Sequence, residues 1–132
     1  MSVWHGDSHK KKLSGGRKVA HRKKRRFERG AFPAETTMGE RKLKMVRRRG
    51  GNLKTRALRE NHANISDTTT GKTEKMEILR VVRNPANVDY NRRGVITKGT
   101  IIETEHGSAL VTSRPGQQGL INATLMPKEA KE

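Results

Sequence analysis

The 132-residue sequence has no cysteine, one Trp, one Tyr, two Phe, and 13 acidic residues against 30 lysines and arginines. Without cysteine, disulfide frameworks, thiolate zinc sites and thiol nucleophiles are excluded. The longest unbroken apolar run is the three residues Ala109–Val111. That run is too short for a transmembrane helix or a secretory signal. We therefore expect a soluble intracellular chain with no membrane partner.

Apolar residues are also scarce, whereas positive charge is abundant. Only 30% of the chain is hydrophobic, and the formal net charge is +17. An ordinary globular domain is about 45–50% apolar when Gly is counted. A chain this poor in core material is not expected to be compact throughout. Its charge predicts a polyanionic partner, nucleic acid before an anionic membrane.

The positive charge is concentrated in the first half of the chain. Residues 1–60 hold 20 Lys/Arg and 5 Asp/Glu, whereas residues 61–132 hold 10 and 8. This division predicts a basic extension over residues 1–50, a folded domain over 51–127 and a flexible tail over 128–132. The first 35 residues carry too few apolar groups to offset the entropy of ordering, so we expect them to order only on a partner.

Local patterns predict a mainly β fold with one or two short helices. The capping-box spacing from Thr37 to Glu40, followed by Gly50-Gly51, predicts a helix near residues 38–48. Asn84 is expected to cap a second helix from Pro85 to about Arg92, and a third is possible within residues 20–29. Period-two patterns and intervening turns predict a small antiparallel β-barrel of six or seven strands, near residues 53–58, 62–67, 76–83, 95–98, 100–105, 109–114 and 120–126.

No residue pattern indicates catalysis or a cofactor. Gly71-Lys72-Thr73 lacks the earlier glycine of a phosphate-binding loop and is better explained as a hairpin turn. The His5, Asp7 and His9 group has no fourth ligand, so metal binding is disfavoured. Glu103 and Glu105 fit a solvated strand face. We predict that the protein is not an enzyme and uses no metal, cofactor or small-molecule substrate.

Recurrent basic runs are the strongest functional signal. They lie at Lys10–Lys12, Arg17-Lys18, Arg22–Arg26 and Arg47–Arg49. Such runs neutralise phosphates, and Arg also stacks on bases. Trp4 is a candidate to stack on an unpaired base, although hydrophobic anchoring is equally plausible. RNA is favoured over DNA because the sequence shows no groove-reading helix or dimer signature.

Several motifs, in order along the chain, resemble a ribosomal protein family of the archaeal and eukaryotic small subunit, family eight-e. The matching segments are Lys12–Arg17, Glu28–Gly30, Pro33–Thr36, Gly50–Arg56, Asn84–Asn87, Arg92–Gly99 and Thr112–Gln117. The short length is similar to the archaeal form. Two positions depart from the family pattern: Gln118 replaces a usual acid, and Arg29 replaces a usual apolar residue.

The resemblance implies a β-barrel with a basic extension that penetrates RNA. It also implies a cytoplasmic structural constituent of the small ribosomal subunit, which binds and clamps small-subunit ribosomal RNA beside neighbouring ribosomal proteins. The alternative is a free RNA chaperone or nucleic-acid-compacting protein. The expected RNA-binding residues are Trp4, Lys10, Lys11, Lys12, Arg17, Lys18, Arg22, Lys23, Lys24, Arg25, Arg26, Arg47, Arg48, Arg49, Lys54, Arg56, Arg92, Arg93, Lys98 and Arg114.

Overall fold

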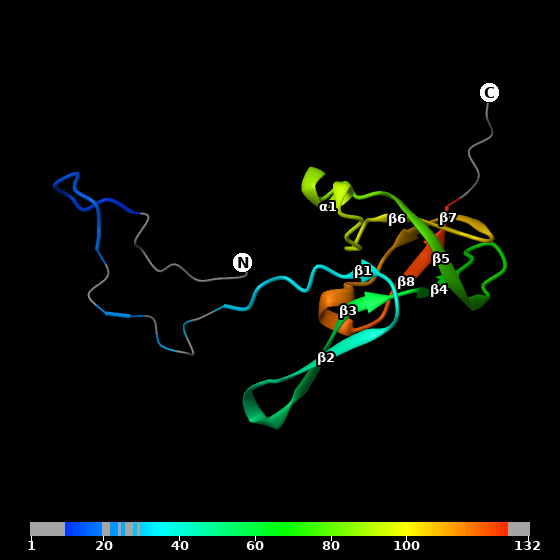
Figure 1. The fold of residues 1–132 in the computed structure, drawn as a ribbon, viewed down its shortest axis with the longest axis horizontal. Helices are drawn as coiled ribbons and strands as arrows, with labels where there is room; N and C mark the ends of the chain where they lie inside the picture. The colour runs from blue at the N-terminus through cyan, green and yellow to red at the C-terminus, as the bar shows by residue number, and fades with distance from the viewer. Residues whose placement is uncertain (1–9, 20–21, 24, 26–27, 29, 127–132) are drawn as a thin grey trace. The chain divides into compact units, whose positions relative to one another are not determined.

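The computed structural model describes residues 10–19, 22–23, 25, 28 and 30–126 (Figure 1). The chain divides into two compact units, Met1–Pro33 and Ala34–Glu132. The boundary expected near residue 50 falls within the second unit, inside a β-hairpin turn. The name basic extension is therefore kept for residues 1–33, the first unit. Most of the possible helix within residues 20–29 lies outside the described residues.

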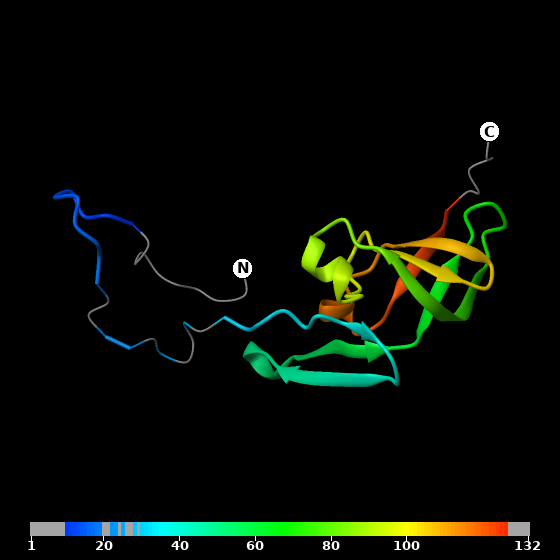
Figure 2. The same ribbon diagram turned by 45° about the horizontal axis from the view of Figure 1, so that its top comes forward.

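The second unit contains a closed five-stranded barrel (Figure 2). In order around the barrel, its strands are β4 (His62–Ser66), β5 (Thr73–Arg83), β6 (Ile101–Thr104), β7 (Gly107–Val111) and β8 (Asn122–Leu125). Successive strands pair antiparallel, and a parallel pairing of β4 with β8 closes the barrel. The structure therefore confirms a mainly β fold with a small barrel, with fewer barrel strands than expected.

Aliphatic side chains fill the barrel interior. Ile65, Ile78, Ile102, Val111 and Ile121 are each no more than 3% exposed. Alternation along the strands sends these residues inward, and burying each side chain contributes roughly 1.5–3 kcal/mol. Asn64 and Asn122 face each other across the parallel closure, where the Asn64 Nδ2 donates to Asn122 Oδ1 at 3.0 Å. The barrel thus closes around a core of small and branched residues.

A three-stranded sheet precedes the barrel, with its strands in the order β1-β3-β2. They are β1 (Thr37–Met38), β2 (Lys42–Arg47) and β3 (Leu53–Glu60). The helix expected near residues 38–48 is therefore wrong, because residues 42–47 form β2. Antiparallel pairing of β2 with β3 outweighs the weak local helix signal, and Gly39 has a non-helical φ of +147°. Gly50-Gly51 forms the hairpin turn rather than a helix stop.

Two short helices complete the described fold. Helix α1 (Val88–Arg92) begins at Asn87, whose side chain accepts from the Asp89 N–H at 2.9 Å. The expected cap, Asn84, is instead buried, and its Nδ2 donates to the Val95 carbonyl at 2.6 Å. Residues 95–98, expected to form a strand, are irregular in the structure, so this prediction is wrong. Helix α2 (Pro115–Gln118) connects β7 with β8. None of the helices in the described ranges is long and apolar enough to span a membrane.

Candidate nucleic-acid interface

The described part of the basic extension contains a tight turn between cationic segments. The Lys12 N–H donates to the Gly16 carbonyl at 2.8 Å, and Gly15 adopts a φ of +81°. An isolated antiparallel bridge sets Lys11 opposite Arg17. Like charges directly opposite one another repel, so this turn is suited to an anion between them. Trp4, Lys24 and Arg26 lie outside the described residues, as do His5, Asp7 and His9.

A second part of the extension is held by Glu28. The Arg22 Nη1 donates to Glu28 Oε2 at 2.7 Å, and the Arg25 N–H donates to the same oxygen at 2.9 Å. These hydrogen bonds lower the pKa of Glu28 to about 2. Arg22 is therefore paired with a carboxylate six residues along the chain and fixes the local conformation of this segment. Lys23 and Arg25, which we also expected at the RNA surface, are exposed.

In the second unit, three consecutive arginines occupy the tip of the β2–β3 hairpin. Arg47, Arg48 and Arg49 are exposed, and no described carboxylate lies within 4 Å of their guanidinium groups. The Arg48 N–H donates to the Asn52 carbonyl at 2.7 Å, and the short 3-10 turn η2 (Arg49–Gly51) follows. Positive φ values at Gly50 and Gly51, 74° and 78°, permit this tight reversal.

The hairpin also places basic residues opposite one another along its strands. Lys44 pairs in register with Arg56, and Lys42 pairs with Arg59. Residues directly opposite in an antiparallel pair share a face of the sheet, so each pair sets two positive charges side by side. Lys54 lies two residues from Arg56 and shares its face, and its Nζ donates to Gln117 Oε1 of α2. Lys54 pairs with Val46 beside the hairpin turn, so the basic hairpin, residues 42–59, contacts α2 near its tip.

The expected cations on the barrel are of two kinds. Arg92, Lys98 and Arg114 are exposed, and the Arg114 backbone N–H donates to Gln118 Oε1 at 2.9 Å. Arg93, by contrast, donates to Glu35 Oε2 at 2.7 Å and forms an ion pair with Asp89 at 2.9 Å. The hydrogen bond from Arg93 lowers the pKa of Glu35 below its ordinary value.

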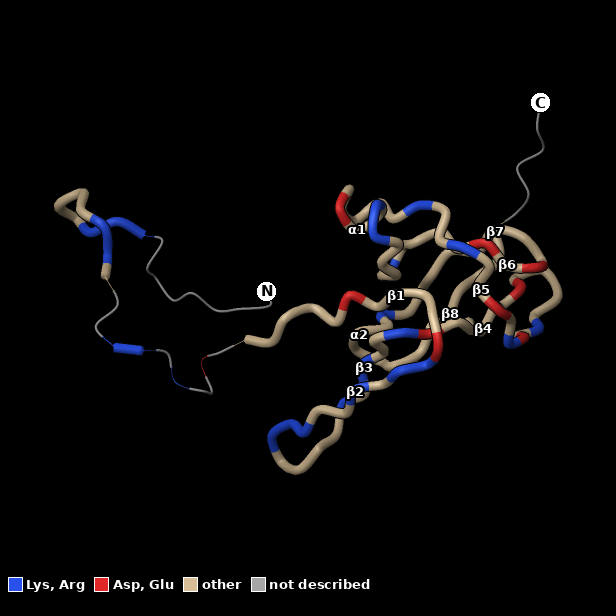
Figure 3. Tube along the Cα trace, in the orientation of Figure 1, with Lys and Arg blue, Asp and Glu red and all other residues tan. Residues whose placement is uncertain are grey.

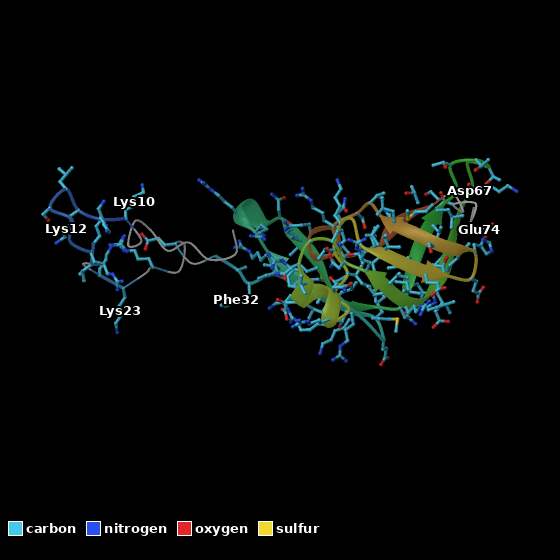
Figure 4. The ribbon with its side chains drawn as sticks, turned by 90° about the horizontal axis from the view of Figure 1, so that it is seen from above. Lys10, Lys12, Lys23, Phe32, Asp67 and Glu74 are labelled. Atoms are coloured by element: carbon cyan, nitrogen blue, oxygen red, sulfur yellow. The ribbon has the colours of Figure 1, made fainter. Side chains whose placement is uncertain are left out.

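Charge is distributed unevenly within the second unit. Residues 37–60 carry nine Lys/Arg and two Asp/Glu, whereas residues 61–126 carry eight and six. Figure 3 shows basic residues concentrated along the β2–β3 hairpin, whereas acidic residues interspersed with lysines lie at the end of the barrel that holds the β4–β5 and β6–β7 turns, the acidic end. Asp67 and Glu74 lie close together at the acidic end (Figure 4). The basic hairpin is thus the strongly positive part of this unit.

Sequence reasoning overlooked four cations of the sheet. They are Arg41, Lys42, Lys44 and Arg59, of which Lys44 lies opposite the predicted contact residue Arg56 and Lys42 lies opposite Arg59. Alternation of Leu43 and Met45 with lysines, followed by Gly50-Gly51, is a hairpin signal that would have found three of them. Arg41 differs from the others because it forms an ion pair with buried Glu60 at 3.2 Å.

The groups considered for chemistry lie on strands and turns of the barrel. Arg80 and Glu103 form a cross-strand ion pair, and Glu105 is exposed in the next turn. Gly71 and Lys72 lie in the β4–β5 turn, where Asp67 accepts from the Thr69 N–H at 2.8 Å. Within the described ranges, no three His, Asp or Glu side chains gather as metal ligands would.

The sequence matches a protein family along almost its whole length. The family described as Ribosomal protein S8e matches residues 5–126. The chain belongs to the ribosomal S8e family. This match confirms the resemblance seen in the sequence motifs, and it spans both the basic extension and the second unit.

Individual relatives support the S8e assignment. The chain is 51% identical over 124 residues to the small ribosomal subunit protein eS8 of Methanocorpusculum labreanum, covering 94% of this chain and 98% of that relative. It is 50% identical over 113 residues to the eS8 protein of Methanobrevibacter smithii, covering 86% and 90%. The eS8 protein of Hyperthermus butylicus is 48% identical over 133 residues, covering 99% and 97%. The similarity is therefore not confined to the barrel.

Proposed function

We propose that this S8e-family protein is a structural constituent of the small ribosomal subunit, where it binds and clamps small-subunit ribosomal RNA during assembly and translation. Its partners are that RNA and neighbouring small-subunit proteins, in the cytoplasm. The near-complete similarity to proteins named small ribosomal subunit protein eS8 supports this proposal.

The arrangement of charge in the basic hairpin carries the proposal. Lys44 opposes Arg56, Lys42 opposes Arg59, and the three tip arginines have no acidic partner among the described residues. Opposed like charges destabilise an isolated sheet. Phosphates placed between them would remove this repulsion and release counterions. The hairpin is thus better suited to a nucleic-acid complex than to the free protein.

In this proposal the two basic regions act together on folded RNA. The extension supplies phosphate contacts through Lys10–Lys12, Arg17, Lys18 and the cations of residues 23–26, whereas Arg22 holds Glu28. The hairpin adds its tip arginines, and Arg92, Lys98 and Arg114 extend the contact onto the barrel. Arg is suited to bidentate contact with phosphate, whereas Lys contributes a point charge. The chain contributes position and charge, with no reacting group.

Sedimentation tests the proposal against a free RNA chaperone. The tagged protein, expressed in an archaeal host, is followed through gradients at low and high salt. We expect it to sediment with small subunits at low salt and to leave them only at high salt, because many phosphate contacts make binding steeply salt-dependent. Recovery at the top of the low-salt gradient would contradict the ribosomal role and favour the chaperone.

A further inference from the structure

Residues 34–38 form a strap that fastens the start of the second unit to the sheet and barrel. Thr36, only 2% exposed, donates from Oγ1 to the Ala57 carbonyl at 2.7 Å. Its own carbonyl accepts from the Ile96 N–H, also at 2.7 Å. The next residue, Thr37, begins β1, which pairs parallel with β3. Because residues 1–33 continue directly from this strap, the strap is where the basic extension joins the folded part of the protein.

The first residue of the strap packs against α2. A Cβ built on Gly116 would lie 3.0 Å from the Ala34 Cβ, so Ala34 occupies the space that this glycine leaves open. The basic hairpin reaches the same helix through Lys54 and Gln117. Helix α2 therefore contacts both the start of the strap and the basic hairpin, the latter near the beginning of β3.

Glu35 combines a left-handed backbone conformation with an ion pair to Arg93. Its φ of +47° is left-handed, a conformation that residues other than Gly seldom adopt. Its carboxylate is bound by Arg93, whose guanidinium also contacts Asp89 and lies 5.5 Å from the Tyr90 ring centre. Arg93 thus connects the strap with α1 through two carboxylates and an aromatic ring.

We infer that Arg93 is a positioning residue that holds the strap in place through Glu35. The acidic side chain of Glu35 thereby raises the affinity of the protein for RNA. The inference rests on the proposed RNA-binding function. Its basis is that Arg93 already has two acidic partners, whereas the cations of the hairpin tip have none among the described residues. A fixed strap limits the conformations of the joined extension and so reduces the entropy lost on binding.

Charge alone predicts the opposite effect for Glu35. Replacing a carboxylate with an amide makes the protein more positive and should strengthen its attraction to phosphates. If the strap depends on the ion pair, the same substitution should weaken binding. Glu35→Gln therefore separates the two explanations by the sign of the change, not merely by its size.

The experiment measures the affinity of the full-length protein for transcribed archaeal small-subunit ribosomal RNA. Glu74→Gln is the matched control, because it removes the same charge from an exposed acid at the end of the barrel opposite α1 (Figure 2, Figure 4). We expect Glu35→Gln to weaken binding about two- to fivefold, the range of a surface ion pair, and Glu74→Gln to leave it unchanged or tighter. Glu35→Asp, which keeps the carboxylate, should restore part of the loss. Equal or tighter binding by Glu35→Gln would overturn the inference.

The salt dependence of binding tests the role of Arg93 separately. If Arg93 positions the strap, Arg93→Gln should weaken binding without changing the slope of log affinity against log salt. If it contacts a phosphate, the slope should fall by about one. Hydrogen exchange without RNA supplies an independent readout, because the Ile96 amide donates to the Thr36 carbonyl. Its exchange should accelerate in Glu35→Gln, and unchanged exchange would count against the strap.

These measurements also distinguish failure of the inference from failure of the proposed function. If the wild-type protein does not bind the ribosomal RNA in preference to an unrelated structured RNA, the proposed function fails and the inference fails with it. If wild-type binding is specific but Glu35→Gln behaves as Glu74→Gln does, only the inference about the strap is wrong.

Discussion

The barrel and the basic hairpin belong to one folded unit, but their charged side chains are arranged differently. In the barrel, cations and acids are nearly balanced, and Arg80 pairs with Glu103 across two strands. In the hairpin, Lys44 instead faces Arg56. Some of the barrel's charges are thus paired inside the protein, whereas Arg47, Arg48 and Arg49 at the hairpin tip have no acidic partner among the described residues.

In the proposed function, the barrel supplies the stability of the fold and the basic regions supply the affinity for RNA. The barrel folds on its aliphatic core and on satisfied polar groups such as Asn84, which bonds Val95, Thr97 and Ala86. The hairpin leaves Met45 and Leu53 each 64% exposed and presents its arginines to solvent. Substitutions in the barrel should therefore change the free energy of unfolding, and substitutions in the basic regions should change RNA affinity.

Removing residues 1–33 should have the largest effect on affinity. The deletion eliminates 11 of the 30 Lys/Arg residues but leaves the strap intact. We expect affinity for small-subunit ribosomal RNA to fall on the order of 1000-fold at moderate salt, because several phosphate contacts are lost together. The melting temperature should change little. Filter binding and thermal unfolding monitored by circular dichroism measure the two quantities.

A longer deletion provides the control for the barrel. Removing residues 1–38 also removes Thr36 and β1, which are bonded to Ala57 and β3. This variant should unfold at a lower temperature than the shorter deletion. If both deletions lower the melting temperature equally, the extension contributes to folding, and the contrast between the two regions is incorrect.

The barrel was largely predictable because alternation is a local signal with a physical cause. A strand with one buried face must place apolar residues at every second position, as Ala63 and Ile65 do in β4. The parallel closure of β4 with β8 depends on residues 58 positions apart and leaves no such signal. Residues 95–98 were predicted as a strand, and Val95 and Ile96 are buried as a strand would bury them. Their backbone groups, however, bond Asn84, Tyr90 of α1 and Thr36 rather than a neighbouring barrel strand.

The sequence predicted which segments of the candidate interface are basic, but not how their charges are arranged. Basic runs and family motifs pointed to the extension and to Arg47–Arg49 as candidate RNA contacts, which remains a prediction. The same Gly50-Gly51 was interpreted as a helix end, so the pairing of Lys44 with Arg56 could not be foreseen. The partner of Arg93 is Glu35, 58 residues away, and a count of charges cannot distinguish a paired arginine from an exposed one.

Gly119→Ala tests the packing of the segment after α2 against Thr55 of β3, where the barrel and the basic hairpin meet. A Cβ at Gly119 would lie 2.6 Å from Thr55 Cγ2, and the residue has a φ of +78°. Overpacking and left-handed strain together should destabilise the protein by about 2–4 kcal/mol in urea unfolding. Gly71→Ala is the matched control, since Gly71 has a φ of +69° but nothing within 4 Å. Gly71→Ala should lower the free energy of unfolding by only about 1 kcal/mol. If both variants lose the same stability, backbone strain alone explains the effect of Gly119→Ala.

Neutralising the hairpin tip should lower affinity without lowering stability. Arg48→Ala with Arg49→Ala removes two exposed cations that have no described acidic partner. We expect affinity to fall about tenfold and the salt slope to fall by about two. Lys72→Ala with Lys75→Ala removes the same charge from the acidic end of the barrel, and its effect should be clearly smaller. Equal losses would indicate attraction to net charge rather than contact by the hairpin.

The smallest expected effects come from adding one negative charge to the α2 turn. Gln118 Oε1 accepts from the Arg114 N–H at 2.9 Å, so the carboxylate of Gln118→Glu can accept the same hydrogen bond. We expect a stability gain of about 0.5 kcal/mol at pH 7. That gain should be lost below about pH 4, where the carboxyl group is protonated in the folded protein as well.

Gln117→Glu, one position earlier, carries the same charge but should act on the other region. Gln117 accepts from Lys54 of the basic hairpin, so a carboxylate there would hold that lysine as an ion pair. It should therefore weaken RNA binding more than Gln118→Glu does, by about two- to threefold. The two variants are compared by RNA titration at matched salt and by urea unfolding at pH 7 and pH 3. If they lower RNA affinity equally, the ion pair with Lys54 has no separate effect on binding, and only the added negative charge matters.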